Sequence, residues 1–332
     1  MGERVVRVAL AQMRVVGGDP AGNVARAREA VRRGAAAGAE VVVLPECLDL
    51  GWAHPGAAAL AAHIPGPRTD ALAGAAVACG VHVVAGLVER DGASVYNAAV
   101  LIDDRGAIVL HHRKIHELSM AHGLYALGDR LSVASTALGR VGLAICADLL
   151  PSGLLLGHAL CQMGARLLLC PCAWAVPADH DQRTVPYGAL WRQAYGRLAR
   201  RHGVAVVGVS GVGGLEAGPW AGRVCIGCSL AVGPDGSVVA QGPYGPAAES
   251  LLLARLPLQA SPRHPADSRP PVRLRRVLRH RAGGAARRGG ADVNAAHNAR
   301  DTGPGPAVPA CGTDARPHGK RVGGPGRSRK PR

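Results

Sequence analysis

Up to residue 260 the chain repeats one pattern: a short run of β-branched and other apolar residues, a turn, then an Ala/Arg-rich segment of helical character. Strands that alternate with helices form sheets covered by helices, so the pattern predicts an α/β fold. Strands are predicted at residues 5–11, 41–44, 81–88, 98–102, 108–112, 142–146, 167–170 and 204–209. Helices are predicted at residues 20–37, with Asp19 as the N-cap, and near residues 70–79, 152–163 and 186–202.

The pattern changes in the last third of the chain. Residues 228–242 contain two apolar runs separated by Gly-Pro-Asp-Gly, a turn sequence that predicts a pair of strands. One more apolar run, residues 251–256, precedes an abrupt change to Pro, Arg, Gly and Ala without periodicity. We therefore predict one domain over residues 1–260 and a disordered basic tail over residues 261–332.

The positive charge of the chain is concentrated in this tail. The whole chain has a net charge of +16, of which +13 belongs to residues 261–332 and +3 to residues 1–260. A strongly basic chain suggests a nucleic-acid or anionic-surface partner, and a binding protein that uses the tail is the alternative from another functional class. Its support is charge alone, because the tail has no aromatic residue to stack on single-stranded bases. We therefore do not expect nucleic acid to be the partner.

The cysteine count and the apolar runs bear on the compartment. No run approaches the roughly 18 apolar residues that a membrane helix needs, and the first residues lack a long apolar stretch followed by a cleavage site. Nine cysteines are too sparse for a disulfide scaffold, and their odd number leaves at least one unpaired. We therefore expect a soluble cytoplasmic protein without a membrane partner.

Three predicted strands are followed by a reactive side chain. Glu46 ends VVVLPE, Lys114 ends IVLHHRK and Cys146 ends VGLAIC. Loops that leave a sheet expose such side chains beside a rigid scaffold, which is where sites form in open α/β sheets. Each residue alone has a simpler explanation, as a buried thiol, a solvated acid or a surface charge. Their combination favours an active site.

The order of these residues resembles the nitrilase superfamily of carbon–nitrogen hydrolases. The resemblance covers about residues 4–260 and rests on seven ordered motifs: VALAQM, AEVVVLPE, VYNAAVLID, HHRKIHEL, LGDRLSV, GRVGLAICAD and VVGVSGVG. It implies a four-layer αββα sandwich, a reactive set of Glu46, Lys114 and Cys146, and a homo-oligomer. It also implies a small-molecule amide substrate, with no metal or organic cofactor.

The chemistry explains why these residue types are needed. A thiol with an ordinary pKa of about 8.5 needs a base beside it to act as a nucleophile near neutral pH, and Glu46 can take its proton. Attack on an amide carbon places negative charge on oxygen, which Lys114 and the backbone N–H of Ala147 can stabilise. A thioester on Cys146 would then be hydrolysed by water activated by Glu46.

The remaining site residues have open alternatives. Many members of the superfamily carry a second glutamate between the lysine and the cysteine, but His122 stands eight residues after Lys114, where it would be sought. Glu117 is the nearest acid, and either residue is a candidate for this auxiliary role. His116 could orient a substrate or a neighbouring acid, or be a structural histidine. Trp174 could form a wall of the substrate pocket or pack in the core.

The residues after Cys146 bear on the reaction subtype. Nitrile-cleaving members usually have Trp-Glu after the nucleophile, whereas this chain has Ala147 and Asp148. We expect Asp148 to fix the turn by hydrogen bonding to backbone. N-carbamoyl amino-acid hydrolases tend to have an arginine after the Cys-x-Asp, where this chain has Leu149 and Leu150. A neutral amide is therefore the predicted substrate, with an N-carbamoyl-amine hydrolase or a nitrilase as alternatives.

Two further motifs have simpler explanations. Cys225 and Cys228 form a CxxC without a second pair, so we predict thiols that pack in the core and no metal site. The glycines of residues 208–218 lack the context of a nucleotide-binding loop and predict a tight turn near the pocket.

Overall fold

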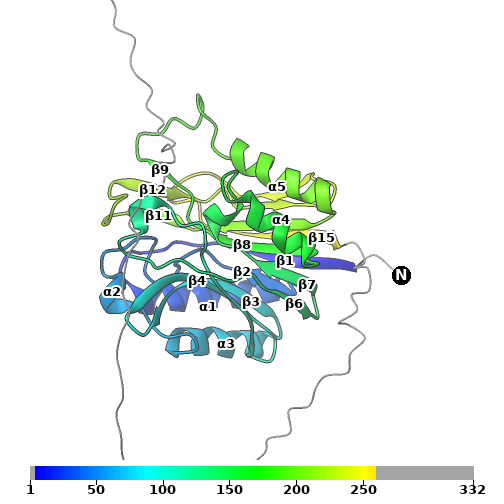
Figure 1. Ribbon diagram of the computed structural model, residues 1–332, viewed down its shortest axis with the longest axis horizontal. Coiled ribbons are helices and arrows are strands. Elements are labelled where there is room, and N and C mark those ends of the chain that lie inside the picture. Colours follow the sequence, from blue (N-terminus) through cyan, green and yellow to red (C-terminus); the bar gives the residue numbers. More distant parts are fainter. Residues whose placement is uncertain (1–3, 259–332) are drawn as a thin grey trace, which may run out of the picture. The chain divides into compact units, whose positions relative to one another are not determined.

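A computed structural model describes residues 4–258 of the protein. Two six-stranded sheets pack face to face, and helices cover both outer faces (Figure 1). In spatial order, the first sheet contains β15 (Ser250–Leu258), β1 (Arg4–Gln12), β2 (Val41–Val43), β3 (His82–Asp91), β4 (Ser94–Ile102) and β5 (Ile108–Arg113). The second contains β14 (Val238–Gln241), β13 (Leu230–Val232), β10 (Ala205–Ser210), β8 (Leu167–Cys172), β7 (Gly139–Leu143) and β6 (Val133–Thr136). The predicted αββα sandwich is confirmed.

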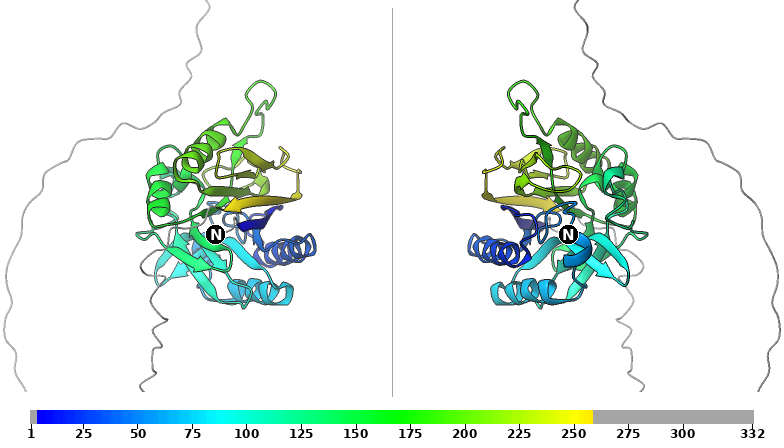
Figure 2. Two further views of the ribbon diagram at one scale, coloured as in Figure 1. Left: turned by 90° about the vertical axis from the view of Figure 1, so that its right-hand side faces the viewer. Right: turned by 90° about the vertical axis from the view of Figure 1, so that its left-hand side faces the viewer.

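The helices form the two outer layers, as the end-on views show (Figure 2). On the first sheet lie α1 (Pro20–Ala36) and α3 (Pro67–Cys79), and on the second lie α4 (Leu154–Gln162) and α5 (Ala189–His202). A third, small sheet has the order β11 (Val212–Leu215), β12 (Arg223–Ile226) and β9 (Ala175–Pro177). Three short helical segments complete the described elements: α2 (Ala57–Leu60), η1 (Ser119–Ala121) and η2 (Cys146–Leu149).

Strand β1 shows how the sequence produces the layers. Val8 and Leu10 belong to the core between the two sheets, whereas Ala9 and Ala11 pack in the core that α1 covers. Successive side chains of a strand point to opposite faces, so an apolar run with large and small residues in alternation fits both layers. Asp19 caps α1 as predicted, accepting a hydrogen bond from the backbone N–H of Gly22 at 2.9 Å.

Several element predictions agree with the structure, and three need correction. The hairpin around Gly-Pro-Asp-Gly is confirmed as β13 and β14. The strand predicted at residues 142–146 already ends at Leu143, because the side chain of Asp148 accepts the N–H of Ile145 at 2.9 Å and draws the chain into η2. Strand β6 and the small sheet were not predicted. The glycine-rich residues 208–218, predicted as a tight turn, contain the end of β10 and all of β11, which pairs with β12.

Other expectations concern parts of the chain beyond these elements. The predicted tail, residues 261–332, lies outside the described residues, and the boundary at residue 260 stays a prediction. Within residues 4–258, none of the helices combines the length and the apolar character needed to cross a bilayer.

Candidate active site

Two of the three predicted reactive residues meet in a buried ion cluster. Glu46 follows β2 and Lys114 follows β5, and the Lys114 Nζ lies 2.7 Å from Glu46 Oε1. The same Nζ lies 3.0 Å from Glu117 Oε1, three residues further along the chain. All three side chains are buried. Of the candidates for the second acid, the structure therefore brings Glu117 to the lysine.

Asn97 completes this cluster and was not singled out from the sequence. Its Nδ2 donates to Glu46 Oε1 at 2.7 Å and to Glu117 Oε2 at 3.0 Å. The residue lies on β4 within VYNAAV, where an amide in the middle of an apolar strand was the available signal. Together, Lys114 and Asn97 hold the two carboxylates side by side.

The cluster has two carboxylates for one ammonium group, and this shifts the pKa of its members. Burial raises the pKa of Glu46, Lys114 lowers it and Glu117 raises it again, so that it lies above its ordinary value. Burial alone would lower the pKa of Lys114, but the two carboxylates outweigh it and hold this pKa well above its usual range. Lys114 is therefore charged at any ordinary pH, whereas Glu46 binds a proton more readily than an ordinary carboxylate does.

The two carboxylate oxygens of Glu46 have different surroundings. Both of its hydrogen bonds, from Asn97 and Lys114, fall on Oε1. No hydrogen bond from any residue in the described range reaches Oε2. This oxygen is therefore available to accept a proton from another group.

Cys146 lies at the first residue of η2, in a left-handed backbone conformation with φ of 41°. Such a conformation is uncommon for a residue with a Cβ and marks a sharp turn that aims the side chain away from the strand direction. Cys146 is only partly buried, unlike most of the cysteines in the described part of the chain. The exposed part of Cys146 faces a cavity, in whose wall this residue lies.

The thiol of Cys146 has close electrostatic contact with its neighbours. A hydrogen bond with the Cys172 thiol lowers the pKa of Cys146, but burial and the Glu46 carboxylate outweigh it and raise this pKa above its ordinary value. Lys114 and the backbone N–H of Ala173 act in the opposite direction. Cys146 in turn contributes to the raised pKa of Lys114. The three predicted reactive residues therefore lie within electrostatic reach of one another.

Asp148 joins the cysteine turn to the segment that carries Lys114. Its Oδ1 accepts the backbone N–H of His116 at 2.7 Å and of Ile115 at 3.2 Å. Its Oδ2 lies 2.8 Å from His112 Nε2 and accepts the N–H of Ile145 at 2.9 Å. Burial raises the pKa of Asp148, but His112 and the backbone donors lower it below its ordinary value. The expectation that Asp148 fixes the turn through backbone hydrogen bonds agrees with this geometry.

The two candidate histidines lie beside the ion cluster without joining it. His116 Nε2 lies 2.9 Å from the hydroxyl of Ser152, and its side chain has no contact with Lys114 among the hydrogen bonds of residues 4–258. His122 Nε2 lies 3.1 Å from the main-chain oxygen of Glu117. His122 therefore supports the loop that carries the second acid and does not replace that acid.

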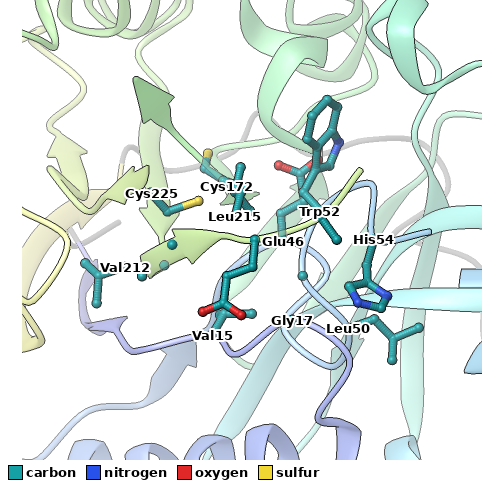
Figure 3. Close-up of a pocket in the computed structure, with 17 residues that line it drawn as sticks. Val15, Gly17, Glu46, Leu50, Trp52, His54, Cys172, Val212, Leu215 and Cys225 are labelled. Carbon is teal, nitrogen blue, oxygen red and sulfur yellow. The ribbon is translucent and has the colours of Figure 1, made fainter. Parts of the chain in front are cut away.

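Two cavities adjoin these residues and share Ala173 in their walls. The Glu46 cavity, of about 300 Å³, is drawn in Figure 3 and is lined by Glu46, Cys172, nearby loop residues and the β11 segment. Trp52, also on its wall, lies with its ring centroid 5.9 Å from Lys114 Nζ. The Cys146 cavity, of about 380 Å³, is lined by Cys146, Ala147, Trp174 and neighbouring apolar residues.

The walls of the Cys146 cavity bear on two sequence predictions, those for Trp174 and for the leucines after Asp148. Trp174 is buried and lines the cavity, so it is both a wall and a packed residue. Leu150 lines the cavity, but Leu149 is fully buried among core residues and does not. The two cysteines of the CxxC motif are both buried; Cys228 packs in the core, whereas Cys225 lines the Glu46 cavity. Nowhere in residues 4–258 do three or more His, Cys, Asp or Glu side chains gather as metal ligands would.

Comparisons with known proteins identify the family of the chain and agree with its fold. The family model described as carbon–nitrogen hydrolase matches residues 7–261. Omega-amidase NIT2 from Xenopus tropicalis is 27% identical over 268 residues, which cover 78% of this chain and 90% of that protein. Omega-amidase NIT2 from Danio rerio is 32% identical over 164 residues, 46% of this chain and 58% of that protein. An amidase from Nesterenkonia sp. AN1 shares the fold with a TM-score of 0.64 and 24% identity, covering 75% of this chain and 92% of its own.

Proposed function

The chain belongs to the carbon–nitrogen hydrolase family, and from that premise we propose that it hydrolyses a small-molecule amide through a thioester on Cys146. The observation that supports this most directly is the Glu46–Lys114–Glu117 cluster beside a cavity whose wall contains Cys146. A nucleophile, a base with a free oxygen and a charged donor are the groups that acyl transfer requires.

In the first half of the proposed reaction, Glu46 Oε2 takes the thiol proton and the thiolate of Cys146 attacks the carbonyl carbon. The resulting oxyanion is stabilised by Lys114, whose charge is maintained by two carboxylates, and by the N–H of Ala147. As the C–N bond breaks, Glu46 returns the proton to the leaving nitrogen. Ammonia or an amine departs, and the acyl group remains on Cys146.

In the second half, Glu46 takes a proton from water, and the hydroxide formed attacks the thioester carbon. The C–S bond then breaks, the acid leaves, and the thiolate of Cys146 recovers the proton from Glu46. Glu117 keeps Lys114 charged and positioned throughout, with Asn97 holding both carboxylates. Each half-reaction returns Glu46 to the ionised state in which it began.

The finer assignments are also proposals. We propose an amide in preference to a nitrile or an N-carbamoyl amine, because the turn after the nucleophile has Ala147 and Asp148 and no arginine. A cytoplasmic location is supported by eight cysteines in the described range that are all unpaired. A homo-oligomer is supported by the resemblance to the superfamily, and light scattering of the purified protein tests it.

The replacement Cys146→Ala tests the mechanism, with Cys79→Ala as the matched control. Cys79 is also a free thiol but lies at the end of α3 and lines neither cavity. We expect Cys146→Ala to lose ammonia release from a panel of amides, while Cys79→Ala keeps it. Intact mass should detect a trapped acyl group in the wild type and in Cys79→Ala alone. A folded Cys146→Ala variant with wild-type turnover would refute the proposal.

A further inference from the structure

The cavity beside Cys146 has an almost wholly apolar wall. Its lining residues are Leu118, Cys146, Ala147, Leu150, Ala173, Trp174, Ala175, His180, Val185, Pro186, Tyr187, Gly188, Ala189, Leu190, Trp191 and Trp220. None of them has a carboxylate, an ammonium or a guanidinium group. The volume of about 380 Å³ falls within the range of small-molecule pockets, about 300–1,000 Å³.

The arginines closest in sequence to this wall are engaged elsewhere. Arg183 is exposed and lies 3.3 Å from Asp181, with which it forms an ion pair. Arg192 donates to Gln241 Oε1 at 2.7 Å. Arg223 lies over the ring of Trp220, with its Cζ 4.7 Å from the ring centroid, and does not line the cavity. A substrate carboxylate inside the cavity would therefore lose its hydration without a charged partner in the wall, which is costly.

Aromatic rings give one side of the cavity a fixed shape. Trp174 stacks on Trp191 with ring centroids 4.7 Å apart, and Trp191 Nε1 donates to the hydroxyl of Tyr187 at 2.9 Å. Rings held in this way offer a rigid apolar surface for a flat or branched group. Two ring nitrogens of these lining residues, Trp174 Nε1 and His180 Nε2, are buried without a hydrogen-bond partner among residues 4–258.

The two cavities divide the substrate between its halves. In the proposed reaction the acyl carbon bonds to Cys146, so the group attached to that carbon must occupy the space beside the thiol. The leaving nitrogen must face Glu46, which returns its proton and lines the other cavity. The apolar cavity is therefore on the acyl side of the scissile bond.

We infer that this cavity selects amides of uncharged, bulky apolar acids, with arylalkyl and medium-length alkyl acyl groups as the favoured class. The inference rests on the proposed amidase function and adds the chemistry of the acyl group to it. A carboxylate at the far end of the acyl chain is disfavoured, because it would reach the wall formed by Leu150 and the aromatic rings.

The first test compares kcat/KM for acetamide, hexanamide, phenylacetamide and succinamate, with acyl-enzyme detected by intact mass. We expect phenylacetamide and hexanamide to exceed acetamide at least tenfold, and succinamate to fall below acetamide. A preference for succinamate or acetamide, with an acyl group on Cys146, would overturn the inference and leave the proposed function standing. Absence of turnover and of acyl-enzyme for all four amides would overturn both.

The second test changes the charge of the wall through Leu150→Arg, with Leu155→Arg as the control. Leu155 is 77% exposed on α4 and lines no described cavity, so it adds the same charge outside the pocket. We expect Leu150→Arg to raise the succinamate-to-hexanamide ratio of kcat/KM at least tenfold and Leu155→Arg to leave it unchanged. Leu150→Gln, which adds polarity without charge, should lower hexanamide activity without improving succinamate. Equal ratios in all three variants and the wild type would overturn the inference.

Discussion

Two buried glutamates, Glu46 and Glu89, have pKa values that shift in opposite directions. Their basic partners, Lys114 and Arg113, are adjacent in the sequence. Glu46 and Glu89 are each 2% exposed. The Glu89 carboxylate accepts hydrogen bonds from Nε and Nη2 of Arg113 at 2.8 Å each, and its Oε2 lies 2.9 Å from His111 Nε2. Burial raises the pKa of Glu89, but these hydrogen bonds outweigh it and lower this pKa to about 2. The pKa of Glu46 is instead raised.

Burial is the largest influence on both pKa values and raises each of them, and the two sites differ in the groups that oppose it. At Glu89 the carboxylate contacts an imidazole and a guanidinium that also pairs with the exposed Asp91, whereas at Glu46 two buried carboxylates share one ammonium group. A surplus of donors fixes the ionised form, which suits a structural link between strands. A surplus of carboxylates leaves a group able to gain and lose a proton, which suits catalysis.

The comparison predicts the largest effect for Lys114→Met, which removes the single cation between two buried carboxylates. We expect kcat/KM to fall by about 10³-fold through the lost oxyanion donor. The free energy of unfolding should also fall by about 3–5 kcal/mol, because the carboxylates lose their partner. Urea unfolding and steady-state kinetics measure the two effects. Near-wild-type activity would exclude Lys114 from the mechanism. Arg113→Met, which changes the neighbouring residue, is the control and should keep kcat/KM while lowering the free energy of unfolding.

Glu46→Gln is the next strongest perturbation, because it keeps the shape of the side chain and removes the proton acceptor. The loss expected for a general base is on the order of 10³-fold in kcat/KM. Alkylation of Cys146 by iodoacetamide, followed by peptide mass spectrometry, should slow as well. Alkylation and turnover that both match the wild type would exclude Glu46 as the base.

Glu117→Gln reduces the carboxylate surplus and should have a moderate effect, about tenfold in kcat/KM, with a distinctive pH signature. The Glu117 carboxylate raises the pKa of Glu46, so its loss lowers that pKa. A base with a lower pKa stays ionised at lower pH, and the acid limb of the kcat/KM profile should therefore move to lower pH. A limb that stays in place or moves upward would contradict the charge-ratio explanation.

Glu89→Gln should affect stability and leave catalysis unchanged. A pKa of about 2 in the folded state, below the ordinary value of 4.5, means that ionised Glu89 stabilises the fold above pH of about 4.5. That contribution is lost as the pH falls from there toward 2. We expect the variant to lose about 1–3 kcal/mol at neutral pH, and the difference from the wild type to shrink in acid. Thermal unfolding at pH 7 and pH 3 measures this, and lower kcat/KM would contradict a purely structural role.

The sequence predicted the layers and the main strands because their apolar residues have short, regular spacing. A run such as residues 41–44 is apolar on both faces, and only a strand buried between a helix and a second sheet satisfies it. Glu46, Lys114 and Cys146 could be predicted to form one site because each ends an apolar run and because their order resembles that of the nitrilase superfamily. The small sheet could not be predicted, since its strands have three or four residues each and β9 lies far from β11 and β12 in the sequence.

The identity of the second acid also depended on structure. The sequence left Glu117 and His122 open, because the path of the loop after Lys114 decides which side chain turns inward. Asn97 was overlooked, since an amide within a strand has many structural explanations. The end of β7 was placed too late, because the hydrogen bond that stops it comes from Asp148, a residue that lies beyond the strand.

The hydrogen bonds of Asp148 have a mechanical consequence. The thiol of Cys146 and the ammonium of Lys114 follow strands of different sheets, and the layer between those sheets consists of Val, Leu, Ile and Ala contacts that have no preferred direction. Such a layer permits small sliding motions, each of which would change the distance from nucleophile to oxyanion donor. Four hydrogen bonds that converge on the Asp148 carboxylate oppose this sliding at the strand ends next to Cys146 and Lys114. The Cys146 thiol and the Lys114 ammonium are therefore aligned in the folded chain before a substrate binds, and substrate binding does not have to align them.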